Sequence, residues 1–356
     1  MVADREATLV IFDDELSPAQ GKNLEGELGK RVIDRAELIL DIFATRARSA
    51  EARTQVELAQ LEYSLPRLTR MWTHLEKFRG GIGVRGPGET QLESDRRLVG
   101  HRIKLLKERL VEITQARQVQ RAGRTGSFRA SLVGYTNAGK SSILRGIAGA
   151  DEIFVEDRLF ATLDPLTREV PVGDGQSVLL TDTVGFIRKL PHHLVASFRA
   201  TLEEVAEAQL LLHVIDASHP SWEEQRFVVD DVLAELGVQH LPMTYVFNKM
   251  DRLAPEAQEG LRERMENLAP GSLFTSAATP EGLEPLRAFL RDVLRDRRPE
   301  VEVLVALTDG RLLAEVHRMG EVLSSTADAD EGVMRLRGRF DPAVLARLER
   351  DGAVRA

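Results

Sequence analysis

The stretch that decides the fold is Gly134-Tyr135-Thr136-Asn137-Ala138-Gly139-Lys140-Ser141, which matches the pattern G-x-x-x-x-G-K-[ST]. It follows the apolar, strand-like segment Phe128–Val133 and opens a predicted helix that continues through Ser142, which is the context this motif requires. In such a loop, backbone N–H groups surround a phosphate at a helix N-terminus. We expect Lys140 to reach the β- and γ-phosphates of a nucleotide and Ser141 to offer its hydroxyl to Mg²⁺.

Two further segments fit a magnesium-dependent switch. Asp182-Thr183-Val184-Gly185 ends the predicted strand Ser177–Thr181, about 40 residues after the phosphate loop. An aspartate there is expected to hold Mg²⁺ through water, while the Gly185 N–H senses the γ-phosphate. Between the two motifs lies Phe160-Ala161-Thr162-Leu163-Asp164, whose Thr162 is the candidate for a mobile threonine that closes on Mg²⁺. Lys140, Thr162 and Gly185 are the predicted catalytic residues.

A third group of residues predicts the base. Asn248-Lys249-Met250-Asp251 follows the predicted strand Thr244–Phe247. The Asp251 carboxylate can accept two hydrogen bonds from the N1–H and N2–H₂ edge of guanine, and adenine would leave it unpaired. Ser276-Ala277 follows the next strand and would place a backbone N–H near guanine O6. GTP and GDP are therefore the expected ligands.

The order of these motifs predicts an α/β fold around a nucleotide-binding domain at 127–298, with a parallel-rich sheet and flanking helices. The strands are expected at Phe128–Val133, Glu169–Val172, Ser177–Thr181, Leu210–Ile215, Thr244–Phe247 and Leu273–Thr275. An N-terminal α/β unit is expected at 1–65, with strands at Thr8–Phe12 and Arg31–Ile33. A helical hairpin at 66–126 follows, interrupted at Gly80–Glu89. A small α+β domain at 299–356 is expected to contain two strands and two helices, separated by a polar stretch.

Charge is distributed unevenly along the chain. The whole sequence carries a net charge of −8, but Pro66–Ala130 contains 15 Lys/Arg and 6 Asp/Glu, a local charge of +9. Such asymmetry, with arginine dominating, favours contact with nucleic acid. The chain has no cysteine, which excludes disulfides and Cys-ligated metals. It also shows no apolar run of membrane-spanning length and no signal peptide, so a cytoplasmic protein is expected.

Two positions bear on the rate and cofactors of hydrolysis. Phe186 stands where Ras-like enzymes place a water-orienting glutamine, so we hypothesise that intrinsic hydrolysis is slow and needs a group from elsewhere. Asn137 resembles the asparagine of potassium-assisted members of this class, which adds K⁺ to Mg²⁺ as an expected cofactor.

The sequence resembles the HflX family of GTPases over nearly its whole length. The resemblance rests on 12–18 (FDDELSP), Asp34-Arg35, 55–61 (QVELAQL), the glycine-rich loop Gly80–Glu89 with Leu92-Glu93 and Asp95-Arg96-Arg97, and both switch segments. Members usually have a longer lead-in before the FDDELSP segment, so two alternatives are expected: the N-terminal unit is incomplete, or the true start of the protein lies further upstream.

The resemblance implies a cytosolic GTPase that binds the large ribosomal subunit and splits stalled or idle ribosomes under stress. We also expect the protein to be a monomer. The resemblance further implies that the hairpin contacts ribosomal RNA. The expected contact residues are Arg79, Gly83, Arg85, Gly86, Gly88, Arg96 and Arg97. Two alternatives remain open: a GTPase of ribosome assembly or RNA modification, and a nucleotide-gated scaffold whose helices bind a protein.

Overall fold

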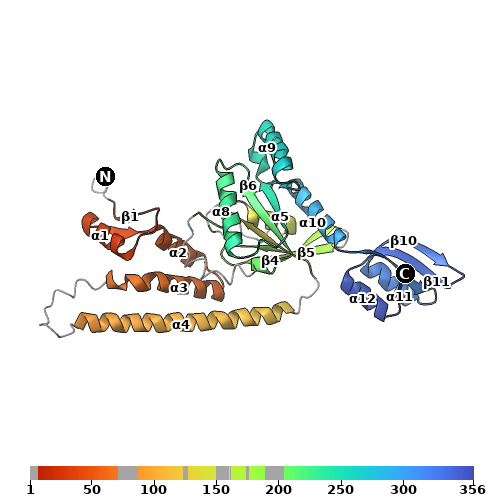
Figure 1. Cartoon of the computed structure of the whole chain (residues 1–356), viewed down its shortest axis with the longest axis horizontal. Helices are drawn as coiled ribbons and strands as arrows, with labels where there is room; N and C mark the ends of the chain where they lie inside the picture. Colours follow the sequence, from red (N-terminus) through yellow and green to blue (C-terminus); the bar gives the residue numbers. More distant parts are fainter. Residues whose placement is uncertain are drawn as a thin grey trace.

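The computed structural model describes residues 7–70, 87–122, 127–149, 160, 162–173, 176–188 and 204–356. The chain forms an N-terminal region with a long helical pair, a central α/β domain and a C-terminal α+β unit (Figure 1). This arrangement confirms the predicted fold class. Within the described ranges, no helix combines the length and the apolar character needed to cross a membrane.

The N-terminal region begins as two βα units. The elements are β1 (Leu9–Ile11), α1 (Pro18–Leu28), β2 (Arg31–Ile33) and α2 (Arg35–Arg46), and the two strands pair in parallel. Ser17 caps α1 by accepting a hydrogen bond from the Gln20 N–H, while the Gln20 side chain accepts one from the Ser17 N–H. This reciprocal capping, with Pro18 at the first helical position, fixes where α1 starts.

The helical pair consists of α3 (Ala50–Ser64), continued by the 3₁₀ helix η1 (Leu65–Arg70), and α4 (Pro87–Ala122). Leu106 is buried between the two helices, and ion pairs join Glu57 to Arg102 and Glu62 to Lys107. The first arm therefore starts near residue 50, earlier than the predicted start of the hairpin at 66. The described part of helix α4 starts at Pro87, inside the predicted glycine-rich break Gly80–Glu89.

The central sheet has the order β4-β5-β3-β6-β7-β8. All neighbours are parallel except the edge pair of β4 and β5, which is antiparallel. The six predicted strands are all present, within a few residues. Their bounds are β3 (Arg129–Gly134), β4 (Leu166–Gly173), β5 (Gln176–Asp182), β6 (Leu210–Asp216), β7 (Met243–Asn248) and β8 (Leu273–Phe274).

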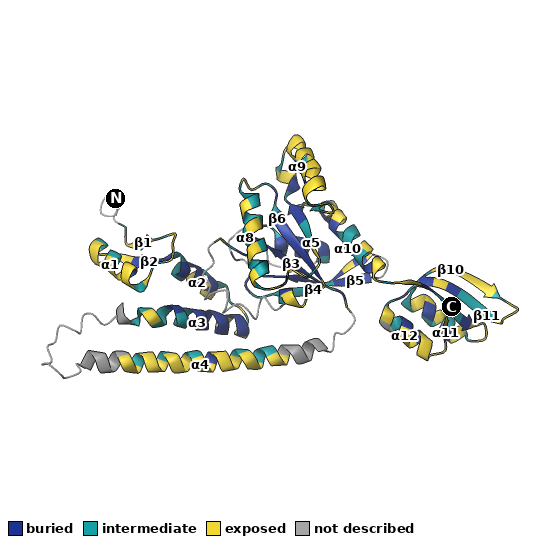
Figure 2. Cartoon of the chain, viewed as in Figure 1, coloured by how far each residue is buried: buried dark blue, intermediate teal, exposed yellow. Residues whose placement is uncertain are grey.

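Helices cover both faces of this sheet, so its central strands β3 and β6 are buried (Figure 2). Helices α5 (Lys140–Ala148) and α10 (Glu284–Asp296) pack on one face, and α8 (Trp222–Glu235) packs on the other. Helix α9 (Pro255–Leu268) and the 3₁₀ helices η2 (Met250–Arg252) and η3 (Glu281–Leu283) connect the later strands.

The core on the α8 face does not stop at the central domain. It includes Leu211 and Val229 of that domain together with Phe43 of α2 and Val56 of α3. Phe160 and Phe186, from the two predicted switch segments, lie in the same cluster. The N-terminal region is thus packed directly against the segments expected to respond to nucleotide.

The C-terminal unit contains β9 (Glu300–Ala306), α11 (Gly310–Met319), β10 (Glu321–Asp328), β11 (Val333–Arg339), α12 (Pro342–Arg350) and β12 (Val354–Arg355). The strands form an antiparallel sheet in the order β10-β11-β9-β12, with its own core around Phe340. The predicted polar stretch is wrong, because it forms β10. As an edge strand with consecutive exposed residues along its middle, β10 lacks the alternation that marks a strand in the sequence.

Candidate functional site

The phosphate loop connects β3 to α5, as its sequence predicts. Gly139 caps α5 with a φ of +100°, and a Cβ there would lie 2.2 Å from the Asn248 Nδ2. Only glycine tolerates both the left-handed backbone and that close approach. The loop is therefore held tightly against the segment predicted to choose the base.

Lys140 is buried, with 6% of its surface exposed, and its Nζ donates to the carbonyls of Gly134 (3.1 Å) and Tyr135 (3.0 Å). Burial lowers the pKa of Lys140 to about 8, although the nearby Asp182 carboxylate acts in the opposite direction. The positive charge of the buried Lys140 ammonium is only partly balanced by nearby negative charge, so an anion bound in the loop would favour the charged form of Lys140.

Three side-chain oxygens from three separate segments meet beside Lys140. Ser141 Oγ, at the start of α5, lies 2.8 Å from Thr162 Oγ1 and donates to Asp182 Oδ2 at 2.6 Å. Thr162 Oγ1 also donates to Asp182 Oδ2, at 3.0 Å. Burial raises the pKa of Asp182, while Lys140 and the two hydroxyl hydrogen bonds oppose that rise. The three predicted metal-site residues are thus brought together.

The geometry of this group fits a magnesium ion. Magnesium takes oxygen ligands at about 2.0–2.1 Å in an octahedron, so neighbouring ligands lie about 2.9 Å apart. The separation of the Ser141 and Thr162 hydroxyls, 2.8 Å, matches such an edge. Asp182 Oδ1 is buried and has no hydrogen-bond partner in the described part of the chain, which leaves it free to accept from a metal-bound water.

The segment after Asp182 pairs with the phosphate loop. The Phe186 N–H donates to the Gly134 carbonyl at 3.1 Å, and the Thr136 N–H donates to the Phe186 carbonyl at 2.7 Å. At Gly185, a Cβ would lie 2.7 Å from the Thr136 Cα, so this contact requires glycine. The Phe186 side chain is 2% exposed and lies in the hydrophobic core shared with α2, α3 and α8.

The other switch segment contacts both the phosphate loop and the N-terminal region. The Phe160 N–H donates to Thr136 Oγ1 at 3.1 Å, and its backbone has a φ of +55°, which is uncommon for a residue other than glycine. Its ring stacks edge-to-face on Phe43 of α2, with the centroids 4.7 Å apart. The predicted nucleotide contact Ala161 lies outside the described residues.

The residues predicted to select the base form a connected network. Asn248 Nδ2 donates to the Ala138 carbonyl at 3.0 Å, and its Oδ1 accepts from the Ala277 N–H at 3.2 Å. Ser276 Oγ donates to Asp251 Oδ1 at 2.5 Å, which fixes the carboxylate that would read guanine. The segments at the ends of β7 and β8 therefore converge on the phosphate loop.

Lys249 adds a partner that the sequence analysis missed. Its Nζ donates to the Asn137 carbonyl at 2.8 Å and to Asp216 Oδ2 at 2.7 Å. Asp216 is the last residue of β6, one position beyond the predicted strand. The one feature of the sequence that pointed to it is that an acidic residue stands at the end of a strand. Burial would raise the pKa of Asp216, but hydrogen bonds from Lys249 and Ser218 outweigh it and lower the pKa.

The predicted RNA contacts are only partly described. Arg96 and Arg97 lie exposed on α4, and Gly88 lies near the start of its described part. Arg79, Gly83, Arg85 and Gly86 fall outside the described residues. Ser142, another predicted nucleotide contact, is partly buried in α5.

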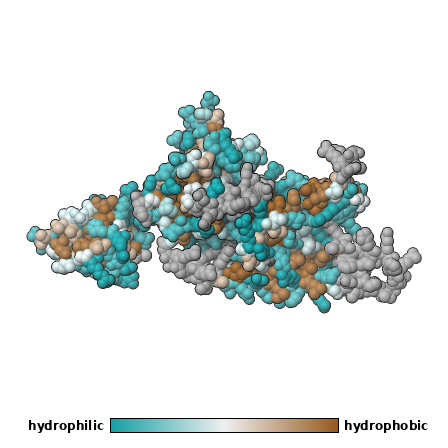
Figure 3. Space-filling view, turned by 180° about the vertical axis from the view of Figure 1, so that it is seen from behind, coloured by the Kyte–Doolittle hydropathy of each residue, from teal (hydrophilic) through white to brown (hydrophobic). Residues whose placement is uncertain are grey.

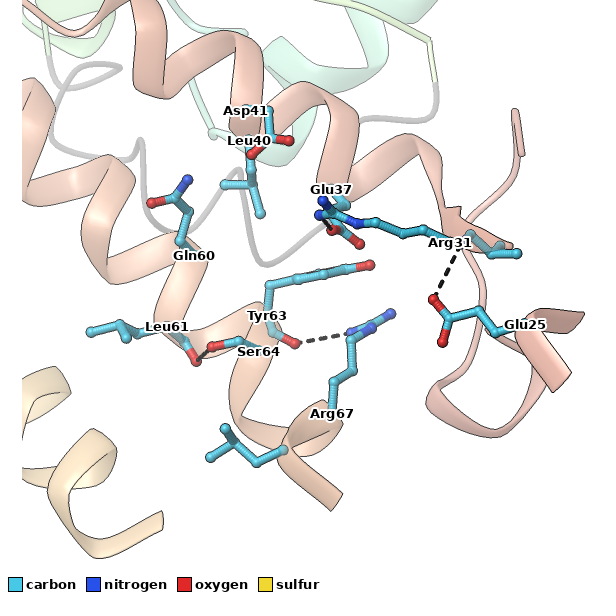
Figure 4. Close-up of a pocket in the computed structure, with 12 residues that line it drawn as sticks. Glu25, Arg31, Glu37, Leu40, Asp41, Gln60, Leu61, Tyr63, Ser64 and Arg67 are labelled. Atoms are coloured by element: carbon cyan, nitrogen blue, oxygen red, sulfur yellow. Dashed lines mark hydrogen bonds and ion pairs between the residues drawn. The ribbon is translucent and has the colours of Figure 1, made fainter. Parts of the chain in front are cut away.

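A separate cavity of about 570 Å³ lies in the N-terminal region, between α2, α3 and η1 (Figure 4). Tyr63 and Arg67 line it, with the Arg67 guanidinium 3.6 Å from the Tyr63 ring centroid. The Tyr63 hydroxyl donates to the buried Asp34 at 2.8 Å, and burial together with this bond raises the pKa of Tyr63. The cavity shares no residue with the nucleotide motifs.

Comparisons with known proteins agree with this geometry. Three family models match: a GTP-binding GTPase N-terminal model over residues 1–44, a GTP-binding GTPase middle region over 46–124 and a 50S ribosome-binding GTPase over 129–249. The GTPase HflX of Magnetococcus marinus is 47% identical over 352 residues, covering 98% of this chain and 80% of the relative. That of Escherichia coli is 45% identical, covering 92% of this chain and 76% of the relative.

The chain belongs to the HflX family of GTPases. A third relative, the GTPase HflX of Caldanaerobacter subterraneus subsp. tengcongensis, is 54% identical over 85% of this chain and 68% of its own length. Among solved structures, the SsGBP–GDP complex is 28% identical, covers 82% of each chain and has a TM-score of 0.49. Its curated relatives and its GTPase family model show that this HflX-family protein is a GTPase, with the magnesium dependence usual for its domain. The N-terminal and middle-region family models meet at 44–46, where α2 ends.

Proposed function

We propose that this HflX-family GTPase is a GTP-driven switch that binds the large ribosomal subunit and separates stalled or idle ribosomes, particularly under stress. In this proposal it acts as a monomer in the cytoplasm, and the ribosome stimulates hydrolysis. The observation that carries the proposal is the long basic helix α4, which packs against α3. Helix α3 in turn shares one hydrophobic core with both switch segments.

Within this proposal, Ser141, Thr162 and Asp182 hold Mg²⁺, the last through water. Lys140 and the backbone of the phosphate loop bind the phosphates, and the Gly185 N–H contacts the γ-phosphate. A bound magnesium ion neutralises charge that develops on the phosphates during transfer. Thr162 and Gly185 thus tie the two switch segments to the presence of GTP, and release of the γ-phosphate frees them.

The base is selected by Asp251, which Ser276 holds in place. Replacing Asp251 with asparagine removes the double acceptor for guanine and is expected to shift preference towards xanthine nucleotides. Asn137, exposed in the loop with a left-handed backbone, is the proposed site of K⁺ assistance. Equal hydrolysis rates in Na⁺ and K⁺ would remove that assignment.

RNA binding is assigned to the basic hairpin. Helix α4 carries eight Lys/Arg against five Asp/Glu, and its Arg96 and Arg97 are exposed, as phosphate contact requires. Arg79, Arg85 and the backbone of Gly83, Gly86 and Gly88 complete the proposed contact.

A second candidate function has its own observation. Three large apolar side chains of α4, those of Leu98, Leu105 and Val111, are 64%, 44% and 56% exposed. Figure 3 shows hydrophobic patches along the lower edge of the molecule, where α4 lies. Exposed large apolar residues on a helix favour a protein partner. A nucleotide-gated scaffold therefore remains the rival.

Light scattering of ribosomes mixed with the protein separates these candidates. We expect loss of intact ribosomes with GTP or a non-hydrolysable analogue and no loss with GDP. Reversing the charge of Arg96 and Arg97 should abolish splitting, whereas Leu98→Ser with Leu105→Ser should leave it unchanged. The opposite pattern would favour the scaffold, and no splitting with any nucleotide would refute the proposal.

A further inference from the structure

Asp164 joins the switch segment that contains Thr162 to the start of α3. Its Oδ2 accepts hydrogen bonds from the backbone N–H groups of Arg48 and Ser49, both at 3.1 Å. Its Oδ1 accepts a third from the Ser49 hydroxyl. Asp164 and Ser49 are 115 positions apart in the chain, so this contact is tertiary and links two regions.

The partner of Asp164 is the N-cap of a helix. Ser49 Oγ accepts from the Ala52 N–H at 3.0 Å, and Ser49 therefore caps α3 while it donates to Asp164. The first backbone N–H groups of a helix have no partner within the helix, and the helix dipole places partial positive charge there. A carboxylate at this point gains charge-assisted hydrogen bonds, which are stronger than neutral ones.

Thr162 lies two residues before this contact. Between them, Leu163 is 2% exposed and belongs to the core shared with α2 and α3. The Thr162 hydroxyl meets Ser141 and Asp182 in the arrangement that fits magnesium. The segment is thus held at one end by the site and at the other by α3.

We propose that Asp164 is a positioning residue for GTP hydrolysis: by binding the N-terminus of α3, it holds Thr162 at the magnesium site. This inference rests on the proposed role of Thr162 as a magnesium ligand. The two effects are reciprocal. If the hydrogen bonds of Asp164 to α3 favour the position of Thr162 at the magnesium site, then binding of GTP and Mg²⁺ should in turn strengthen the hydrogen bonds between Asp164 and α3.

Hydrolysis at varied Mg²⁺ concentration tests the positioning role on the full chain. Removal of the charge-assisted bonds in Asp164→Ala should raise the Mg²⁺ concentration for half-maximal activity by roughly tenfold. Asp164→Asn and Ser49→Ala, which are milder changes, should raise it by a smaller factor. The matched control is Glu169→Gln, which alters another serine–carboxylate contact (Ser177 Oγ to Glu169 Oε1, 2.5 Å) and should not change the Mg²⁺ dependence.

Hydrogen exchange provides a readout independent of activity. In the wild-type protein, a GTP analogue with Mg²⁺ should slow exchange of the Arg48 and Ser49 amides relative to GDP, and in Asp164→Ala it should not. A purely structural role would lower the melting temperature without changing the Mg²⁺ dependence, which would overturn the inference.

Thr162→Ala separates failure of this inference from failure of the proposed magnesium site. If Thr162→Ala changes the Mg²⁺ dependence and the Asp164 and Ser49 variants do not, the positioning role fails and the proposed site stands. If Thr162→Ala also leaves the Mg²⁺ dependence unchanged, the assignment of Thr162 to the metal fails and the role of Asp164 fails with it.

Discussion

Lys249 and Asp216 form an ion pair, 2.7 Å between Nζ and Oδ2, at the ends of the adjacent strands β7 and β6. Each side chain is 13% exposed. Because Lys249 also donates to the Asn137 carbonyl, the pair connects the base-recognition segment to the phosphate loop. An acid that belongs to none of the sequence motifs thus holds two of them together.

Replacing Asp216 with asparagine should lower the free energy of unfolding at pH 7 by roughly 1–3 kcal/mol, because it removes the charged acceptor of a largely buried lysine. The folded-state pKa of Asp216 is lowered, so its contribution is present above the unfolded pKa of about 3.9 and is lost as the pH falls through the folded value. Urea unfolding should therefore show a constant difference from pH 7 to about pH 5 and a smaller one below about pH 4. The exposed Asp292→Asn is the control, and a difference that grows in acid would contradict this account.

The pKa of about 8 for Lys140 predicts a proton linked to nucleotide binding. In the unfolded chain the pKa of a lysine is about 10.4. Between about pH 8 and 10.4 the unfolded chain therefore binds more protons than the folded one, and the free energy of unfolding of the nucleotide-free protein rises with pH. Bound phosphates favour the charged lysine, and GDP affinity should fall above about pH 8 with uptake of up to one proton. Calorimetry in two buffers of different ionisation enthalpy measures this uptake. Lys140→Met should abolish it, and binding at about pH 9 without proton uptake would refute the prediction.

The buried Phe186 predicts the outcome of restoring the glutamine found in Ras-like enzymes. Phe186→Gln should destabilise the protein by roughly 2–4 kcal/mol, because it removes core packing and buries an amide. It should not accelerate intrinsic hydrolysis, since the side chain at this position is buried in the hydrophobic core. Phe186→Leu should cost about 1 kcal/mol and leave the rate unchanged. Single-turnover hydrolysis with parallel unfolding curves checks both variants, and faster hydrolysis by a stable Phe186→Gln protein would show that this side chain reaches the attacking water.

The central domain could be predicted well from the sequence because its strands carry apolar residues and most of its motifs follow a strand end. Ser141 and Asp182 could be placed in one site because the parallel strands β3 and β5 present their carboxyl ends at one edge. Thr162 joins them because β4 is antiparallel, so the amino end of β4, which follows Thr162, lies beside Asp182 at the same edge. Asp216 was missed because a lone acid at a strand end has no distinctive spacing. Its role exists only in the contact with Lys249.

The features of the fold that could not be predicted from the sequence depend on side chains that stay exposed or on contacts between residues far apart in the chain. Strand β10 has exposed residues along its middle, so its sequence reads as a polar loop. The contact of Asp164 with Ser49 joins residues far apart in the chain, and no local pattern could reveal it.

Co-sedimentation with large ribosomal subunits tests the central claim most directly. With a non-hydrolysable GTP analogue, the protein should pellet with the subunits, and with GDP it should stay in the supernatant. Charge reversal at Arg96 and Arg97 should weaken the analogue-bound complex and flatten its dependence on salt, because binding then neutralises fewer phosphates and releases fewer counterions. Equal pelleting of the wild-type and charge-reversed proteins, or pelleting that does not depend on the nucleotide, would contradict the account.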